Sequence, residues 1–422
     1  NNKDLSGLVN GVTAKITAKA VNLQNSSIDY LIVNATDKVS VNGTIKNVSI
    51  DTLKDIILVT DVDLVVNHIY TAGNLDLEVN GKLTAKSDVT NVKAINITIQ
   101  ANMIGNTDNF LVIDIDGTAD LISGKDVYLE ILSDLIIKKI TAKDTVFLKG
   151  TGNISQIDNG KIIGKNLVID ITGDLGTALQ VISLDIETID LTSSNAYFSN
   201  ALENDLQVIK MNVNDVICLM AGNLTGINEI SGNYLIAKIS GNFGKIEKVI
   251  KTNVDKIKLN VSGSIYLNNN LTKDLIIESI IARNEIIMAS GNIQVSDDRQ
   301  NNIEAKRLEM NVAGSIASSL APIKMLVEKI KITVQDDIYL VNDLTKDLTI
   351  ESIIAGNDVV MTIGNAAIGS LAANGNVDLN VSGNIIASSD EVNIVANRLQ
   401  IIISGDVAEF DEVLKTSVNT LL

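Results

Sequence analysis

The chain has 422 residues and a formal net charge of −17, and 45% of its residues are hydrophobic although only 3% are aromatic and none is tryptophan. The acidic balance, without a basic patch interleaved with aromatic residues, argues against nucleic acid as a partner. A single cysteine excludes an internal disulfide framework, and no apolar run reaches the roughly 18 residues of a membrane-spanning helix. The apolar residues are mostly Ile, Val, Leu and Ala, and the β-branched ones favour strands.

Apolar and polar residues alternate in short segments along the whole chain, for example at residues 75–79, 95–99, 168–171, 308–312 and 377–381. This period of two predicts short β-strands with one face buried and the other in water. Segments with a helical period are scarce. No run of Pro, Gly or Ser divides the chain, which indicates one continuous architecture.

Most of these predicted strands end in a glycine followed by Asn, Ser or Asp and then an aliphatic residue. Glycine permits a positive φ, and Asn or Asp tolerates it or bonds the local backbone, so we expect a corner at each site. The spacing is even: Gly222 to Gly241 is 19 residues, and Gly291 to Gly314 is 23. The spacing therefore predicts a coil that winds once per repeat; the glycines are Gly152, Gly173, Gly222, Gly241, Gly263, Gly291, Gly314, Gly383 and Gly405.

A longer repeat lies in the second half of the chain, where residues 256–288 recur almost intact as residues 329–361. Leu271 of the first copy corresponds to Leu344 of the second, and this offset equals three to four turns. Each of these leucines begins the sequence Leu-Thr-Lys-Asp-Leu, and Asp134 has a similar place in a diverged earlier copy. This pentapeptide is either a displayed epitope or, as we favour, a polar corner before a buried strand in a duplicated stacked array.

These observations predict an all-β fold, a right-handed parallel β-helix (β-solenoid) with about 20 residues per turn. Each strand is expected to pair with the equivalent strand one turn further on, which gives roughly 20 turns and a length on the order of 100 Å. We expect the helix to be continuous over residues 1–406, with residues 407–422 as a C-terminal cap or the start of a following segment.

Few residues offer chemistry. His68 is the only histidine and has no cysteine companion, so we expect a surface or corner position, not a zinc site or a serine triad. Cys218 lies in an apolar run and is expected to be a small buried hydrophobic residue. Four acidic pairs suggest acid–base or calcium chemistry, but residues i and i+2 share a face of any strand; the pairs are Asp61 and Asp63, Asp114 and Asp116, Asp297 and Asp298, and Asp336 and Asp337. The sequence therefore assigns no catalytic, cofactor-binding or metal-binding residue.

The segment Ile354-Ala-Gly-Asn-Asp-Val, continued by Ala372-Ala-Asn-Gly-Asn-Val-Asp-Leu-Asn-Val-Ser-Gly-Asn-Ile, resembles the repeat region of filamentous-haemagglutinin-type exoproteins, the adhesins of two-partner secretion systems. The pattern covers most of the chain and is sharpest at residues 222–407. The resemblance implies a right-handed parallel β-helix, secretion and surface display. The Asn-Pro-Asn motif of the family's secretion domain is missing from the sequence, and Ile, Asn and Lys stand where the family has more Gly and Thr.

The expected function is that of an extracellular bacterial surface protein, an adhesin stalk, spacer or structural fibre without catalysis or cofactor. Its expected partner is a receptor on a host or neighbouring cell, or further copies of the chain. One alternative is a self-assembling filament or surface-layer subunit, because stacked strands end in open edges. Another is a polysaccharide-degrading β-helix enzyme, which needs carboxylates from neighbouring turns beside aromatic or Arg side chains.

Overall fold

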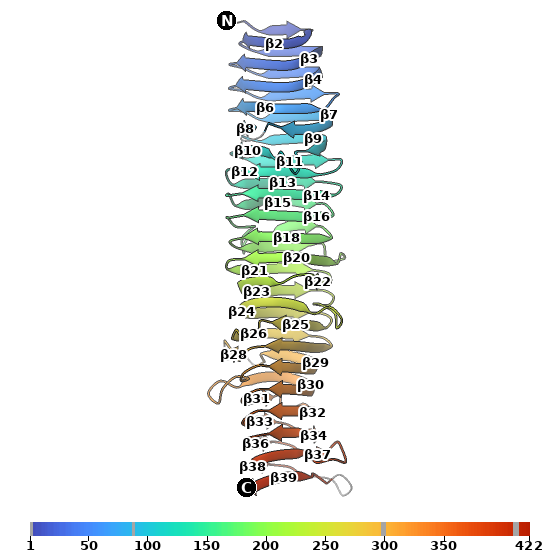
Figure 1. Ribbon diagram of the computed structural model, residues 1–422, viewed down its shortest axis with the longest axis vertical. Helices are drawn as coiled ribbons and strands as arrows, with labels where there is room; N and C mark the ends of the chain where they lie inside the picture. The colour runs from blue at the N-terminus through green and yellow to red at the C-terminus, as the bar shows by residue number, and fades with distance from the viewer. Residues whose placement is uncertain (1–2, 87–88, 297–300, 408–412) are drawn as a thin grey trace. The chain divides into compact units, whose positions relative to one another are not determined.

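The computed structural model describes residues 3–86, 89–296, 301–407 and 413–422. It divides into two compact units, residues 1–206 and residues 207–422. Within each unit, short strands lie one above another, and no helix occurs among the described residues (Figure 1). The prediction of an all-β parallel solenoid with about 20 residues per turn is confirmed.

In the described part of the first unit, 19 strands are complete. They are β1 (Leu5–Gly7), β2 (Asn10–Ala18), β3 (Val21–Ala35), β4 (Val39–Thr52), β5 (Ile56–Thr60), β6 (Leu64–Thr71), β7 (Leu75–Ala85), β8 (Val92–Ala94), β9 (Ile97–Ile104), β10 (Leu111–Ile115), β11 (Thr118–Ser123), β12 (Val127–Ile131), β13 (Leu135–Thr141), β14 (Thr145–Gly150), β15 (Ile154–Ile163), β16 (Asn166–Ile171), β17 (Ile182–Asp185), β18 (Thr188–Ser193) and β19 (Ala196–Asn200).

The second unit holds the remaining strands. They are β20 (Leu206–Val213), β21 (Val216–Ala221), β22 (Leu224–Gly226), β23 (Ile230–Ile239), β24 (Ile250–Val261), β25 (Ile265–Asn269), β26 (Leu275–Ala282), β27 (Glu285–Ser290), β28 (Ile293–Val295), β29 (Ile303–Val312), β30 (Ile323–Val334), β31 (Ile338–Asn342), β32 (Leu348–Ala355), β33 (Val359–Ile363), β34 (Ala366–Ile368), β35 (Leu371–Ala373), β36 (Asn376–Val381), β37 (Ile385–Ala387), β38 (Ile394–Ile403) and β39 (Thr416–Leu421).

Alternate strands belong to two different ladders. In the first unit β12 pairs with β14 and β14 with β16, whereas β13 pairs with β15, and all of these pairings are parallel. Leu129 lies beside Leu148, and Leu148 lies beside Ile169, so equivalent positions recur once per turn. Each turn therefore adds one strand to each of two parallel sheets, and the inward side chains of both sheets form the core between them.

The core consists of files of aliphatic side chains. In the second unit Ile286, Leu308, Ile330 and Ile350 occupy the same position on successive strands of one sheet, and all four are fully buried. Similar side chains stacked at the strand spacing of about 4.8 Å remove one continuous apolar column from water. This packing explains why the sequence is rich in Ile, Val and Leu but poor in aromatic residues.

The corners carry a second, polar ladder on the outside of the stack. The Oδ1 atom of Asn242 accepts a hydrogen bond from the backbone N–H of Ser264 in the next turn, at 2.8 Å. The same bond joins Asn292 to Ser315 at 2.9 Å and Asn365 to Asn384 at 2.8 Å. Side-chain amides also donate along the ladder, as from Asn365 Nδ2 to Asp347 at 2.8 Å. Each corner is thus tied to the next by a side chain as well as by main-chain bonds.

The corner glycines serve a different purpose from the predicted one. A positive φ occurs at Gly7, Gly43, Gly105, Gly150, Gly176 and Gly244 among the described glycines, and at none of the nine glycines of the corner signature. The expectation of positive φ at those corners was therefore wrong. A Cβ atom on Gly263 would lie 2.1 Å from Asn242 Oδ1, and one on Gly314 would lie 2.0 Å from Asn292 Oδ1. At these two corners glycine is needed because the ladder side chain of the preceding turn fills that space, whereas at Gly152, Gly173 and Gly291 the nearest atom belongs to the backbone of the preceding turn.

The last strand, β39, pairs in parallel with β38 and so adds a further turn to the second unit. Residues 408–412 lie outside the described part of the chain. The division into residues 1–406 and residues 407–422 stays a prediction.

Each copy of the long repeat contributes strands to both sheets of the second unit, but equivalent residues of the two copies lie on opposite sheets. Ile265 belongs to the ladder that continues through Ile286, Leu308, Ile330 and Ile350. Its counterpart Ile338 instead pairs with residues 316 and 359, in the other ladder. The predicted three to four turns are therefore about three and a half, and duplicated side chains point to opposite sides.

Candidate functional site

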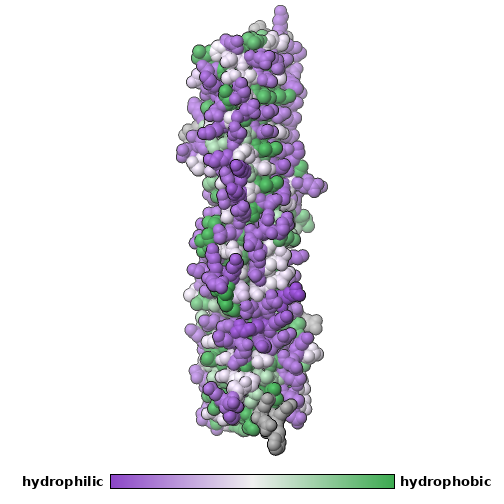
Figure 2. Space-filling view, turned by 90° about the vertical axis from the view of Figure 1, so that its right-hand side faces the viewer, coloured by the Kyte–Doolittle hydropathy of each residue, from purple (hydrophilic) through white to green (hydrophobic). Residues whose placement is uncertain are grey.

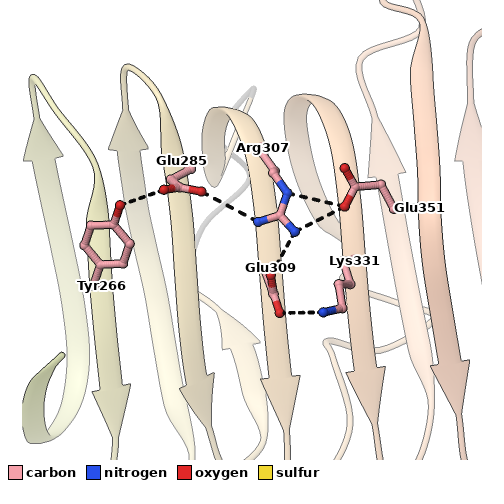
Figure 3. A network of polar contacts seen from close by, with 6 residues as sticks. All are labelled: Tyr266, Glu285, Arg307, Glu309, Lys331 and Glu351. Atoms are coloured by element: carbon pink, nitrogen blue, oxygen red, sulfur yellow. Dashed lines mark hydrogen bonds and ion pairs between the residues drawn. The ribbon is translucent and has the colours of Figure 1, made fainter. Parts of the chain in front are cut away.

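Among the described residues, a network of polar side chains lies on the outer face of one sheet in the second unit (Figure 3). It spans five adjacent strands, from β25 to β32. Its centre is Arg307 on β29, whose guanidinium contacts Glu309 Oε2 at 2.8 Å and Glu351 Oε2 at 3.1 Å, with Glu285 at 3.6 Å. We call this set the Arg307 cluster; its members are Tyr266, Glu285, Arg307, Glu309, Lys331 and Glu351.

Further contacts extend the Arg307 cluster to both sides. Tyr266 donates its hydroxyl hydrogen to Glu285 Oε1 at 2.6 Å, and Lys331 donates to Glu309 Oε1 at 3.0 Å. Partial burial alone would raise the pKa of Glu309, but hydrogen bonds from Lys331 and Arg307 lower it below its ordinary value. Burial and the bond to Glu285 together raise the pKa of the Tyr266 hydroxyl.

A matching cluster lies on the opposite sheet, around residues of the earlier copy of the long repeat. Lys256 Nζ and Lys258 Nζ contact the two oxygens of Glu278 at 3.0 Å and 2.8 Å, and Tyr234 donates its hydroxyl hydrogen to the same carboxylate. Lys258 and Glu278 correspond to Lys331 and Glu351 of the repeat. We call this set the Glu278 cluster; its members are Tyr234, Lys256, Lys258 and Glu278. Burial disfavours the ionised Glu278, yet the bonds from both lysines and the tyrosine lower its pKa to about 2.

Both clusters join strands that are far apart in the sequence. Arg307 and Glu351 are 44 residues apart, which spans two turns, and Lys258 and Glu278 are 20 apart, which spans one. A general acid works best when its pKa lies near the working pH. The lowered pKa values of Glu278 and Glu309 do not meet that requirement. The arrangement therefore ties neighbouring turns together across the outer faces.

The low pKa of Glu278 predicts acid-sensitive stability. Above the ordinary value of 4.5 the carboxylate is ionised both folded and unfolded; between 4.5 and about 2 only the unfolded chain binds a proton, so stability falls as the pH falls. The side chain is 12% exposed, and we expect a loss of about 2 kcal/mol after allowance for solvent screening. Denaturant unfolding at about pH 6 and about pH 2.5 measures it.

The matched comparison is between Glu278→Gln and Glu203→Gln, because Glu203 is exposed. Glu278→Gln should lessen the acid sensitivity of the second unit, whereas Glu203→Gln should leave it as in the original chain. Equal pH profiles for all three proteins would contradict the assignment.

Residues singled out in the sequence take mostly structural positions. His68 Nε2 lies 3.1 Å from Asp51 Oδ2, one turn away, and the His68 ring is 5.0 Å from that of Tyr70. This is a surface position on the outer face, where we expected one, although the carboxylate partner was not foreseen. Cys218 is half-buried on the outer face of β21, and burial raises the pKa of its thiol. The expectation of a buried Cys218 was wrong, because the alternation puts Ile217 and Leu219 inside.

At least one carboxylate of each described acidic pair forms a hydrogen bond or ion pair with a neighbouring turn, and no two of these carboxylates share a partner in these contacts. Asp61 accepts a hydrogen bond from Thr44, and Asp63 accepts one from the backbone of Lys82 at 2.7 Å. Asp114 pairs with Lys93 at 3.0 Å. Asp337 accepts from the backbone of Asp358 at 3.0 Å as part of a corner ladder. Asp297 and Asp298 lie outside the described residues. No group of three or more His, Cys, Asp or Glu residues in the described part of the chain is placed to hold a metal ion.

The two Leu-Thr-Lys-Asp-Leu segments form capped corners. Asn270 Oδ1 accepts from the backbone of Thr272 at 3.0 Å, and Asp343 does the same for Thr345 at 2.9 Å. Asp134, in the diverged copy, accepts from the backbone of Asn153 at 2.8 Å, as a ladder residue. These contacts support the corner interpretation over a displayed epitope.

In the described chain no helix has the length and apolarity to cross a membrane.

The chain was compared with protein families, curated proteins and solved structures. No protein-family model, no curated protein and no solved structure matches the chain.

Proposed function

We propose that the chain is a non-catalytic structural part of an extracellular bacterial surface protein, an adhesin stalk or spacer. The supporting observation is that successive turns within each unit are joined in three ways. Parallel main-chain ladders run along both sheets, aliphatic files fill the core, and side-chain ladders such as Asp347, Asn365 and Asn384 join the corners. The outer faces add ion pairs across turns, as in the Arg307 cluster.

The hydropathy of the outer surface supports a stalk that is surrounded by water. On the face in Figure 2, apolar side chains occur in small groups between hydrophilic ones. The formal charge of −17 adds repulsion between copies, which favours solubility. A receptor on a host or neighbouring cell, or another copy of the chain, remains the proposed partner.

Single-molecule stretching of the whole chain between its ends tests the stalk role. Because the main-chain ladders and the core of each turn contact chiefly the neighbouring turns, we expect turns to be released in small steps. A turn of about 20 residues should add roughly 65 Å of extended chain. Rupture of each unit in one event would contradict this mechanism.

The location and the lack of catalysis need separate tests. Antibodies against the chain should label intact cells of the source bacterium, and labelling confined to permeabilised cells would overturn the extracellular assignment. Cleavage of neutral or acidic polysaccharides, lost in an Asp51→Asn variant, would favour the enzyme alternative instead.

A further inference from the structure

A groove runs along one corner of the first unit, with a volume of about 650 Å³. One bank consists of outward side chains at the ends of strands in one sheet. Asn34 lies beside Asp51, Asp51 beside Tyr70, and Tyr70 beside Lys93, each one turn from the next. With strands about 4.8 Å apart, this bank and the next position, Asp114, extend over roughly 19 Å. The groove therefore suits an extended ligand aligned with the stack.

The opposite bank is formed by the corner residues two positions further along each turn. Leu53 is 60% exposed and Ile95 is 42% exposed. Ala72 lies between them and is much smaller, so this bank is lowest opposite Tyr70. Asp116 follows Ile95 on this bank. The result is an apolar hollow next to an aromatic ring, with Asp51 beside the ring and Asp116 at the far end of the groove.

The polar groups along the groove are held in place by neighbours. Tyr70 donates its hydroxyl hydrogen to the carbonyl oxygen of Thr90 at 2.9 Å, which fixes the ring. Asp51 contacts His68 at 3.1 Å, and Lys93 contacts Asp114 at 3.0 Å. Side chains fixed before binding lose less entropy when a ligand arrives. This order is typical of a binding surface.

The chemistry of the banks selects the ligand. The floor is made of strand residues such as Thr52 and Thr71, whose main chains are paired along the stack, so a peptide finds no free strand edge to extend. Asp51 and Asp116 repel anions, while both carboxylates and Lys93 bond hydroxyl groups. A sugar ring offers an apolar C–H face to Tyr70 and hydroxyls to these groups.

We propose that this groove binds a neutral oligosaccharide several rings long, with one ring packed on Tyr70 above Ala72. The site is independent of the stalk role, because stretching tests the stack and ligand binding tests the groove.

Surface plasmon resonance with the whole chain tests the proposal. The probes are cellohexaose, maltohexaose and chitohexaose, with a hyaluronan hexasaccharide as the anionic comparison and an oligolysine peptide as the cationic one. We expect at least one neutral probe to bind and the hyaluronan probe to bind at least tenfold more weakly. No neutral probe binding, or preferred binding of hyaluronan or of oligolysine, would overturn the proposal.

Three variants locate the site. Ala72→Phe should fill the hollow and abolish binding, and Tyr70→Ala should weaken it at least tenfold. Tyr30→Ala is the matched control, because Tyr30 is an exposed tyrosine of the same unit outside the groove, and it should bind as the original chain does. Asp116→Asn is the third change; because Asp116 is exposed, it should weaken binding without affecting folding. Unchanged binding in Ala72→Phe and Asp116→Asn would place the ligand elsewhere and refute the groove.

Discussion

Replacement of Gly314 by alanine is expected to destabilise its corner by about 2 kcal/mol, because the new Cβ atom meets Asn292 at 2.0 Å and displaces its hydrogen-bonding side chain. Asn292 must then move, and it gives up two hydrogen bonds. Its Oδ1 accepts from the backbone of Ser315 at 2.9 Å, and its Nδ2 donates to Asp274 Oδ1 at 2.7 Å. Hydrogen exchange of the Ser315 amide measures the effect, and protection should fall roughly 30-fold.

A double-mutant cycle separates the clash from other costs. Asn292→Ala alone should also cost about 2 kcal/mol, because it removes the same two hydrogen bonds. In the double variant the alanine at position 314 has no side chain to displace, since the three nearest atoms to its Cβ all belong to Asn292. The two costs should therefore couple by about 2 kcal/mol. Costs that simply add would disprove the proposed contact.

Gly11→Ala is the matched control for this cycle. A Cβ atom there meets nothing within 4 Å, and its φ is not in the left-handed region. Stability should change by less than about 0.5 kcal/mol. A large loss would show that glycine matters at these positions for a reason other than space.

The sequence predicted those features that depend on neighbours along the chain. Alternation over 308–312 placed Leu308, Met310 and Val312 in the core, where they are buried. The even spacing of the corner glycines predicted the turn length, because each turn must close after nearly the same number of residues. The same alternation also had the information to place Cys218 outside, since Ile217 and Leu219 on either side of it are buried. The apolar residues around Cys218 predict burial, whereas the phase of the alternation predicts the outer face, and the phase is correct.

Features that depend on the next turn were not predicted. The purpose of Gly314 depends on Asn292 in the preceding turn, and Arg307 meets Glu351 two turns further on. The repeat offset was the one signal in the sequence that pointed to these outward charges. It relates Lys258 and Glu278 to Lys331 and Glu351, and so marks these outward charges as duplicated together. The half-turn between copies could not be read from the offset alone, because the turn length varies by several residues.

Replacement of Asn342, the buried polar residue at the end of β31, is expected to destabilise the second unit. Asn342 is fully buried, and its amide bonds both backbone groups of Val327 in the preceding turn. Oδ1 accepts from the N–H at 3.1 Å, and Nδ2 donates to the carbonyl oxygen at 3.1 Å. Val327 lies at a bend of β30, between the part that pairs with β31 and the part that pairs with β32. The side chain thus replaces a missing strand partner.

A valine at position 342 should therefore cost about 3 kcal/mol, because two buried backbone groups lose their partner. Threonine has nearly the same shape as valine but carries a hydroxyl group, so Asn342→Thr should cost only about 1 kcal/mol. The first unit shows why: Thr60 is buried at the end of β5, where its hydroxyl accepts from the N–H of Ile45 and donates to the carbonyl oxygen of Ile45, both at 3.0 Å. Denaturant unfolding and exchange of the Val327 amide compare the two variants. If valine and threonine proved equal, hydrogen bonding at this bend would be unimportant, and shape alone would explain why Asn342 is buried.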